Sequence, residues 1–413
     1  MFRQYFNPAA CVGSAIVMVA LSLLSAAPLA AQPSFNVTFG STFDSFRPAT
    51  TASESRQNLA GAVDLDHVFA DERGRMFYTL DAGNYDSPGD WSFYLHDTGF
   101  SYRFGGADPD NRRLFLTGSF VVRQNGEAWT TADYTAAGGG LNAELHPRDG
   151  TTFRTGYRAD YRRFSDLSAL TQLEQRGFVS VLTSFQTRTT LIAEGQIGMK
   201  HYNGVVYTEI APETTVDTAA PHSGFQGQGM GPGFRRPTMP TSLSTNQEGA
   251  AGMVSVMGRL AQSLTDRTGV HGQVTLRRTF GSVPPVLVTT PAGFFEDGVY
   301  DDPFASDALF LQAGVKHVFK NSAEIAATGW WADKAYTSAV ALDDMGTVVS
   351  GSPLRWDTVT LGGVTWTQPL LATKTGPVDL SADIGYRFIR HRSNDTFYNY
   401  TSHAIGVGFS IGY

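Results

Sequence analysis

The sequence predicts an all-β protein, a closed antiparallel transmembrane β-barrel of about 16 strands with short turns at one end and long loops at the other. Three observations predict this fold class. Segments of about ten residues alternate apolar with small or polar side chains, as a strand with two different faces does. No convincing amphipathic helix interrupts these segments. The connections between them alternate between short and long.

The composition excludes several other classes of protein. Of the 413 residues, 42% are hydrophobic and only 17% are charged, against roughly 25% charged in soluble proteins. This low charge, together with 28 Phe and 16 Tyr, excludes a disordered chain. A helical membrane protein would need several apolar runs of about 20 residues, which are absent. The net charge of -7 gives no support for nucleic-acid binding through a basic surface.

Residues 1–31 are expected to be a secretory signal peptide. A positive start at Arg3 precedes the apolar run Cys11–Leu24 and a small-residue end, so cleavage is expected after Ala31. A retained membrane anchor is the alternative, which the Pro-containing end disfavours. Cys11 is the single cysteine and lies far from the cleavage point, where lipid attachment would require it. The mature chain is therefore expected to contain no cysteine.

The remaining residues, 32–413, are expected to form the barrel. The last predicted strand shows the pattern best, with Ile405, Val407, Phe409, Ile411 and Tyr413 on one face and mostly glycine on the other. The predicted strands are about 34–43, 58–69, 75–83, 91–104, 113–123, 134–146, 151–164, 176–186, 190–202, 250–264, 269–280, 308–319, 323–335, 356–371, 377–390 and 400–413.

The connections sort by length. Links from even-numbered to odd-numbered strands are short, polar and often glycine-bearing, as hairpin turns are, for example 147–150 and 266–269. The other links are longer, notably 203–249, 281–307 and 336–355. Lipid offers no hydrogen-bond partners for an open sheet edge, so the barrel must close. The turns are expected in the periplasm and the loops outside the cell.

Aromatic residues gather near the ends of the predicted strands. Amphipathic rings favour the headgroup layers, so two girdles are expected. The girdle near the long loops would contain Trp91, Phe93, Tyr94, Trp330, Trp331, Tyr398 and Tyr400, and the girdle near the turns Phe69, Tyr102, Phe104, Phe319 and Tyr413.

These features together resemble the Gram-negative outer-membrane β-barrels, and the resemblance covers 33–413. It implies a location in the cell outer membrane, contact with outer-membrane lipid and lipopolysaccharide, and passage through the secretion and barrel-assembly machinery. In that class the assembly machinery reads an alternating terminal strand that ends in an aromatic residue, such as Tyr413 here. The strand number is similar to that of general diffusion porins, but the third external loop, about 124–133, is short and the fifth, 203–249, is long. A monomer and a homotrimer both remain open.

If the apolar positions face lipid, the charged positions of each strand line the interior. Two arcs of opposite charge follow from this face. The acidic arc is Asp64, Asp66, Asp81, Asp379 and Asp383, and the basic arc is Arg123, Arg154, Arg158, Arg162, Lys200, Arg259, Arg277 and Lys316. Opposed charged walls would orient polar solutes and set ion selectivity. The alternative is that interior charge pairs only brace the wall.

The function expected from these features is a passive, porin-like channel for small polar solutes or ions. One alternative is an export conduit or a component of a surface-polymer secretion pathway, and a second is an adhesive or structural surface barrel acting through its long loops. The Gly-rich fifth loop is expected to be a mobile surface loop or a lid, and the acidic sixth loop either solvated or a site for divalent cations.

No enzyme, cofactor or resident metal is expected. The segment Gly408–Gly412 matches G-x-S-x-G formally but lies inside a strand, whereas a nucleophile elbow needs a strand-to-helix turn. The nine histidines lack any metal-ligand spacing.

Overall fold

The structure is a computed structural model of the chain. It describes residues 32–48, 54–69, 73–85, 91–104, 112–126, 130, 133–166, 171–203, 207–208, 243–244, 249–281, 302–343, 349, 351, 354–372 and 378–412. The predicted signal peptide, most of the fifth loop and Tyr413 lie outside these residues. No helix in the described part of the chain is long and apolar enough to cross a membrane.

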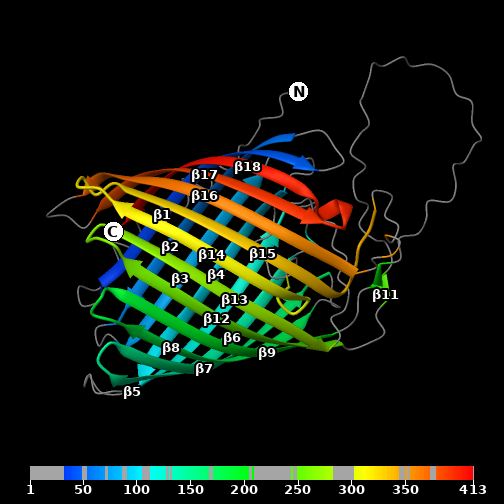
Figure 1. Ribbon diagram of the computed structural model, residues 1–413, viewed down its shortest axis with the longest axis horizontal. Helices are drawn as coiled ribbons and strands as arrows, with labels where there is room; N and C mark the ends of the chain where they lie inside the picture. The colour runs from blue at the N-terminus through cyan, green and yellow to red at the C-terminus, as the bar shows by residue number, and fades with distance from the viewer. Residues whose placement is uncertain are drawn as a thin grey trace, which may run out of the picture.

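Sixteen strands form a single closed barrel in which neighbours along the chain are neighbours in space (Figure 1). The strands are β1 (Gln32–Pro48), β2 (Glu54–Val68), β3 (Gly74–Tyr85), β4 (Trp91–Phe104), β5 (Arg112–Asn125), β6 (Tyr134–Arg148), β7 (Thr151–Phe164), β8 (Gln172–Ser184), β9 (Thr189–Tyr202), β12 (Gly249–Ser263), β13 (Thr268–Gly281), β14 (Ser306–Val318), β15 (Glu324–Val340), β16 (Leu354–Ala372), β17 (Asp379–Ser393) and β18 (Tyr400–Gly412).

The first and last strands close the barrel. They pair antiparallel from Asn36 opposite Gly412 to Pro48 opposite Tyr400, so no strand of the described barrel has a free edge. Every backbone group along this seam can therefore find a partner in the sheet, as a spanning structure requires. The predicted all-β closed antiparallel barrel is confirmed.

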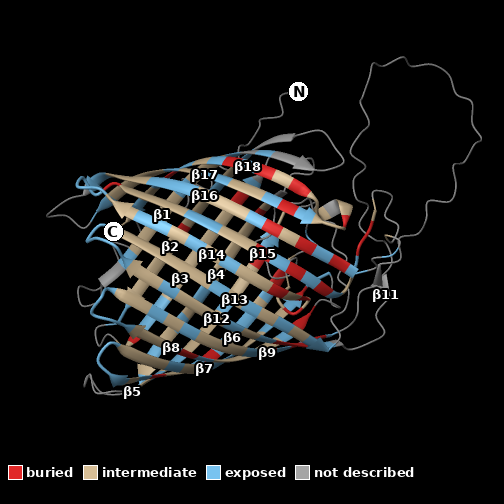
Figure 2. Ribbon diagram, viewed as in Figure 1, coloured by how far each residue is buried: buried red, intermediate tan, exposed pale blue. Residues whose placement is uncertain are grey.

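The two faces of the wall differ as the alternation predicts. Large apolar side chains at every second position are exposed on the outside, for example Ile197 at 56%, Val256 at 58% and Leu276 at 56%. The positions between them point inward and are mostly small, polar or charged, with some large buried side chains such as Tyr134 and Met253. Buried residues gather in the half of the barrel next to the long loops (Figure 2). The closely packed, buried side chains therefore lie at one mouth of the barrel rather than along its whole length.

Tight turns join the strands at the opposite end. Gly150, in the predicted turn 147–150, adopts a φ of 75° between β6 and β7. A Cβ at this position would lie 2.7 Å from the Ser184 carbonyl oxygen, so glycine is needed for both conformation and space. Arg188, between β8 and β9, also adopts a positive φ, of 62°. The chain thus turns where its polar clusters predict.

Several strands extend further toward the long loops than predicted. β15 continues to Val340 and β16 begins at Leu354, which shortens the predicted loop 336–355. Within the predicted loop 203–249, Tyr207–Thr208 (β10) pairs with Leu243–Ser244 (β11) in a small separate sheet. Hydrogen bonds between neighbouring strands continue beyond the residues that alternate apolar with polar. Hydrophobic periodicity alone therefore predicts strand ends that are too early.

The prediction of an aromatic girdle near the long loops is wrong for part of its members. Phe93 and Tyr400 are only 7% and 4% exposed and lie on the inner face, where neighbouring side chains cover them. The reason is strand parity, because each shares its face with inward polar residues such as Ser402 on β18. The other end agrees better with the prediction, since Phe69, Tyr102, Phe104 and Phe319 are 36–43% exposed.

Candidate functional site: the barrel interior and its mouth

The acidic residues predicted for the interior lie on three strands within a run of five neighbouring strands. Asp64 and Asp66 are on β2, Asp81 on β3, and Asp379 and Asp383 on β17, with β18 and β1 between them. Cross-strand pairing links Asp64 to Asn36, Asn36 to Gly412 and Gly412 to Asp379. One row of the wall thus runs from the carboxylate of β17 to that of β2.

Some of these carboxylates have partners in the wall. The Thr79 hydroxyl donates to Asp64 Oδ1 at 2.9 Å, and Arg75 Nε donates to Asp66 Oδ2 at 2.6 Å. Asp383 lies over Gly408, where a Cβ would stand 2.7 Å from its Oδ2. Glycine at this cross-strand position therefore leaves the space that the carboxylate occupies.

The arginine ladder of β7 lies on the inner face, and two of its three members are paired with acids. Arg154 Nη2 contacts Glu144 Oε1 at 3.2 Å, directly across the β6–β7 ladder. Arg158 Nε contacts Asp160 Oδ2 at 2.7 Å and its Nη2 donates to the Ser119 hydroxyl at 3.0 Å. This pairing reduces the positive field that the ladder presents to a solute.

The other predicted basic residues have varied surroundings. Lys316 Nζ lies 2.7 Å from Glu324 Oε2 on the next strand. Arg277 donates to the carbonyl and hydroxyl oxygens of Ser306, and Arg123 donates to Asn125 Oδ1 at 3.1 Å. Arg259 makes no hydrogen bond or ion pair with any described residue. Of these residues and the β7 ladder, Arg154, Arg158 and Lys316 are therefore compensated by carboxylates.

Toward the long loops, inward cations stack on aromatic rings. The guanidinium of Arg123 lies 4.6 Å from the Phe93 centroid, and that of Arg277 lies 5.1 Å from Phe310. We call this set the mouth collar; it comprises Arg123 on Phe93, Arg162 on Tyr134, Arg277 and Lys334 on Phe310, and Arg355 on Tyr336 and Tyr398. A cation over a ring face is attracted by the ring quadrupole, and more strongly when both are desolvated. The collar therefore holds positive charge at the mouth in fixed positions.

The sequence did not single out Lys334, Arg355 or the collar aromatics as interior residues. Their signal was present in strand parity, because Phe93 and Tyr134 alternate with outward apolar residues. The position of an aromatic residue along its strand does not say which face its ring is on. Parity decides this, and it places Phe93 and Tyr134 on the inner face.

A buried polar cluster lies beneath the connections between β15 and β16 and between β17 and β18. The Asp357 carboxylate is fully buried and pairs with Arg355 and with His391, whose Nε2 lies 3.0 Å from Asp357 Oδ2. Asp395 accepts a hydrogen bond from the Leu342 amide at 3.2 Å and so joins the two connections. Burial raises the pKa of Tyr398, which keeps this phenol neutral beside Arg355. The cluster therefore ties the ends of β16 and β17 to the described residues of these two connections.

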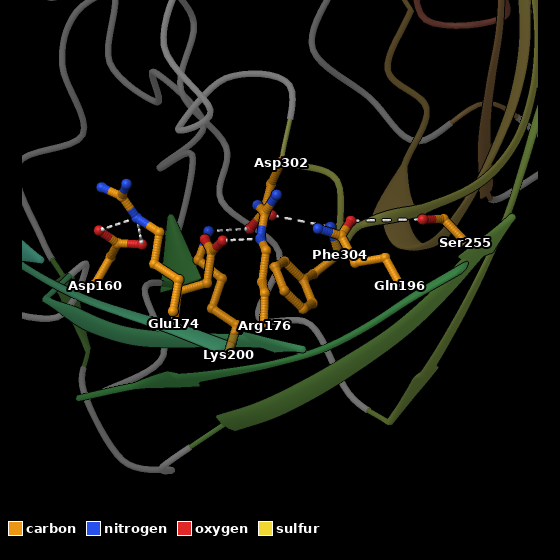
Figure 3. Close-up of polar contacts among 9 residues, drawn as sticks. Asp160, Glu174, Arg176, Gln196, Lys200, Ser255, Asp302 and Phe304 are labelled. Atoms are coloured by element: carbon orange, nitrogen blue, oxygen red, sulfur yellow. Dashed lines mark hydrogen bonds and ion pairs between the residues drawn. The ribbon is translucent and has the colours of Figure 1, made fainter. Parts of the chain in front are cut away.

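The last part of the sixth loop folds against the inner wall. Asp302 Oδ2 lies 2.8 Å from Lys200 Nζ and also accepts a hydrogen bond from the Tyr202 hydroxyl. Phe304 lies beside these residues on the concave side of the strands (Figure 3). Lys200 lies on the inner face and is only 2% exposed. Asp302 belongs to the acidic loop for which the sequence leaves a solvated loop and a cation site open. In the structure its carboxylate binds Lys200 and Tyr202 and holds the end of the loop against β9.

Within the described residues, no group of three or more His, Cys, Asp or Glu side chains is arranged to hold a metal ion. Asp307, another acid of the sixth loop, is bound by Arg278 Nη1 at 2.6 Å and by the Thr279 amide at 2.7 Å.

Comparisons with known proteins concern the fold. No model of a protein family matches the chain, and no curated protein matches it in sequence. Among solved structures, Pseudomonas aeruginosa OccK8 (OprE) is similar at 8% identity and a TM-score of 0.44, over 92% of this chain and 98% of that one. Acinetobacter baumannii OccAB1 is similar at 9% identity and a TM-score of 0.44, over 92% and 96%. A structure described as a bacterial polysaccharide outer membrane secretin is similar at 9% identity and a TM-score of 0.42, over 92% and 97%.

Proposed function

We propose that the mature protein is a passive, water-filled channel for small polar solutes or ions in the outer membrane of a Gram-negative cell. One observation carries the proposal: the barrel is closed and its two faces have opposite character, apolar outside and polar inside.

The outer face supports a lipid environment. Exposed side chains such as Leu260 at 52%, Ile384 at 56% and Ile405 at 54% recur on strands around the barrel. Soluble monomers rarely expose contiguous apolar patches larger than a few hundred Å². In a bilayer the same surface needs no cover, because lipid tails solvate it. Short turns at one end and long loops at the other then favour a periplasmic and an external side, respectively.

The terminal strand supports recognition during assembly. Ile405, Val407, Phe409 and Ile411 all point outward and are 41–54% exposed. Such a row is accessible to the secretion and barrel-assembly machinery before closure and to outer-membrane lipid or lipopolysaccharide afterwards.

The interior supports weak rather than strong charge selectivity. Arg154, Arg158 and Lys316 are paired with carboxylates, which favours the bracing role for these residues. Asp379 and Asp383 have no hydrogen bond or ion pair to a described residue, so they remain available to ions in the lumen. A transverse field between the acidic arc and the mouth collar would orient polar solutes during passage.

Solute flux into vesicles tests the proposal. Residues 32–413, refolded into liposomes, should admit small sugars and amino acids at rates that fall with solute size and do not saturate. Liposomes with the same amount of unfolded chain provide the control. Impermeable liposomes that contain a folded barrel would refute the channel.

A further inference from the structure

The segment Asp302–Ala305 crosses the inside of the barrel wall. It leaves the sheet beside β15, where the Thr337 amide donates to the Ala305 carbonyl oxygen at 3.1 Å. It ends at Lys200 on β9, three strands away from β14 in the order β14, β13, β12, β9. Neighbouring strands lie about 4.8 Å apart, so the distance along the wall from β14 to β9 is about 14 Å. Asp302–Ala305 folds as a tight turn, in which the Ala305 amide donates to the Asp302 carbonyl oxygen at 2.9 Å, so the side chains of Asp302 and Lys200 cover the rest of this distance. Through Phe304 the segment packs on Ala251 and Met253 of β12 and on Tyr202 of β9, on the inner face of the wall.

A buried polar contact holds the far end of this segment. The Asp302 carboxylate binds both Lys200 Nζ, at 2.8 Å, and the Tyr202 hydroxyl. Its second oxygen accepts a hydrogen bond from the Phe304 amide at 3.0 Å, and its carbonyl oxygen accepts one from the Ala305 amide at 2.9 Å. Lys200 is 2% and Asp302 12% exposed. Separating the pair would therefore leave two unpaired charges in a poorly hydrated environment.

Phe304 provides an apolar contact beside the ion pair. The ring is fully buried and packs with Tyr202, Ala251 and Met253 in one cluster. A Cβ at Gly198 would lie 3.0 Å from Phe304 Cζ, so the glycine leaves the space into which the ring fits. The Arg176 guanidinium also lies 5.6 Å from its centroid. The aromatic ring, the ion pair and the glycine together form a fitted seat for the segment.

We propose that the Asp302–Ala305 segment, seated on Lys200, Tyr202 and Gly198, is the element that narrows the mouth of the channel and sets its upper limit of solute size. This inference rests on the proposed channel function. It assigns the size limit to the sixth loop rather than to the short third loop or the long fifth one. It also assigns Lys200 to holding this segment, because its charge is neutralised and hidden from solutes.

Single-channel recording with polymers of graded size tests the narrowing. Asp302→Asn removes the charge and Phe304→Ala removes the ring. Both should raise the conductance and shift the polymer exclusion limit to larger sizes. Asp307→Asn is the matched control, because this carboxylate lies at the start of β14, just after the segment, and pairs with Arg278, which is 82% exposed. Its conductance and exclusion limit should equal those of the wild type. Unchanged values in both Asp302→Asn and Phe304→Ala would overturn the proposal while leaving a conducting channel.

Chemical labelling tests the seat without relying on conduction. The only cysteine of the chain is Cys11, so the mature protein expected from cleavage after Ala31 carries none and single-cysteine variants are clean probes. Met253 lies under Phe304, whereas Met257 lies on the same inner face of β12, four residues further along. The variants Met253→Cys and Met257→Cys therefore compare a covered position with an uncovered one. A polar maleimide should label position 253 at least about tenfold more slowly than position 257, because it must wait for local opening.

Combining Met253→Cys with Asp302→Asn should remove this protection. Equal labelling at positions 253 and 257 in the otherwise unchanged protein would overturn the seat. A folded barrel that shows protection but no conductance would instead refute the channel, so the two failures are distinguishable. The heat-dependent gel mobility typical of folded barrels checks that each variant has folded.

Discussion

Replacing Asp357 with alanine should destabilise the barrel by about 3–5 kcal/mol, because it removes the carboxylate partner of a buried guanidinium. Asp357 is 0% exposed and Arg355 only 7%, and His391 Nε2 approaches the same carboxylate at 3.0 Å. The substitution therefore leaves one buried cation and one imidazole without their acceptor. Stacking of Arg355 on Tyr336, at 4.3 Å, remains and places the cost toward the lower part of this range.

The assay is equilibrium unfolding by urea in phospholipid vesicles, followed by tryptophan fluorescence. Asp266→Ala provides the control, because its ion pair with Arg188 is largely exposed, at 83% and 59%. Loss of such a surface pair costs less than about 1 kcal/mol. If the unfolding free energies of the Asp357→Ala and Asp266→Ala variants were equal, water would be solvating Arg355 and the account of a closed polar cluster would be wrong.

Three further substitutions test the inner face, the backbone and the outer face of the wall. Arg158→Glu should shift the reversal potential in a salt gradient toward cation preference, because it places two unpaired carboxylates beside the lumen, whereas Arg163→Glu, on the outer face of the same strand, should leave it unchanged; no shift in the first would contradict a lumen-facing position for residue 158. Gly150→Val should cost about 1–3 kcal/mol of unfolding free energy, because its φ is 75° and its Cβ would lie 2.7 Å from the Ser184 carbonyl oxygen, whereas Gly362→Val, with no atom within 4 Å of its Cβ, should be nearly neutral; equal costs would contradict the described turn. Val256→Lys should cost about 2–4 kcal/mol in vesicles if this 58% exposed residue faces the bilayer core, and a neutral result would contradict a lipid-facing wall.

The fold could be predicted from the sequence because its signals are local. Strand alternation such as Ile405 to Ile411 and turn clusters such as 147–150 depend on residues close together in the chain. An even number of strands with short turns on one side then leaves a closed barrel as the consistent solution. The same parity assigns the charged residues of each strand to one face of the wall.

The partners of the charged residues could not be predicted in the same way. Glu144 lies opposite Arg154 only because of the register between β6 and β7, which a bulge between Leu145 and Arg148 also shifts. The pair of Lys200 and Asp302 joins positions 102 residues apart through a loop that has no periodic pattern. Phe304 likewise carries no local sign of its seat, since the space for its ring is left by Gly198 on a different strand.

Single-channel recording of residues 32–413 in a planar bilayer tests the central claim most directly. The closed wall, with Val256 exposed outside and Asp383 inside, requires that each inserted molecule open one continuous aqueous path. We therefore expect discrete conductance steps of uniform size that scale with salt concentration. A folded, inserted barrel that passes no current at any salt concentration would contradict the account.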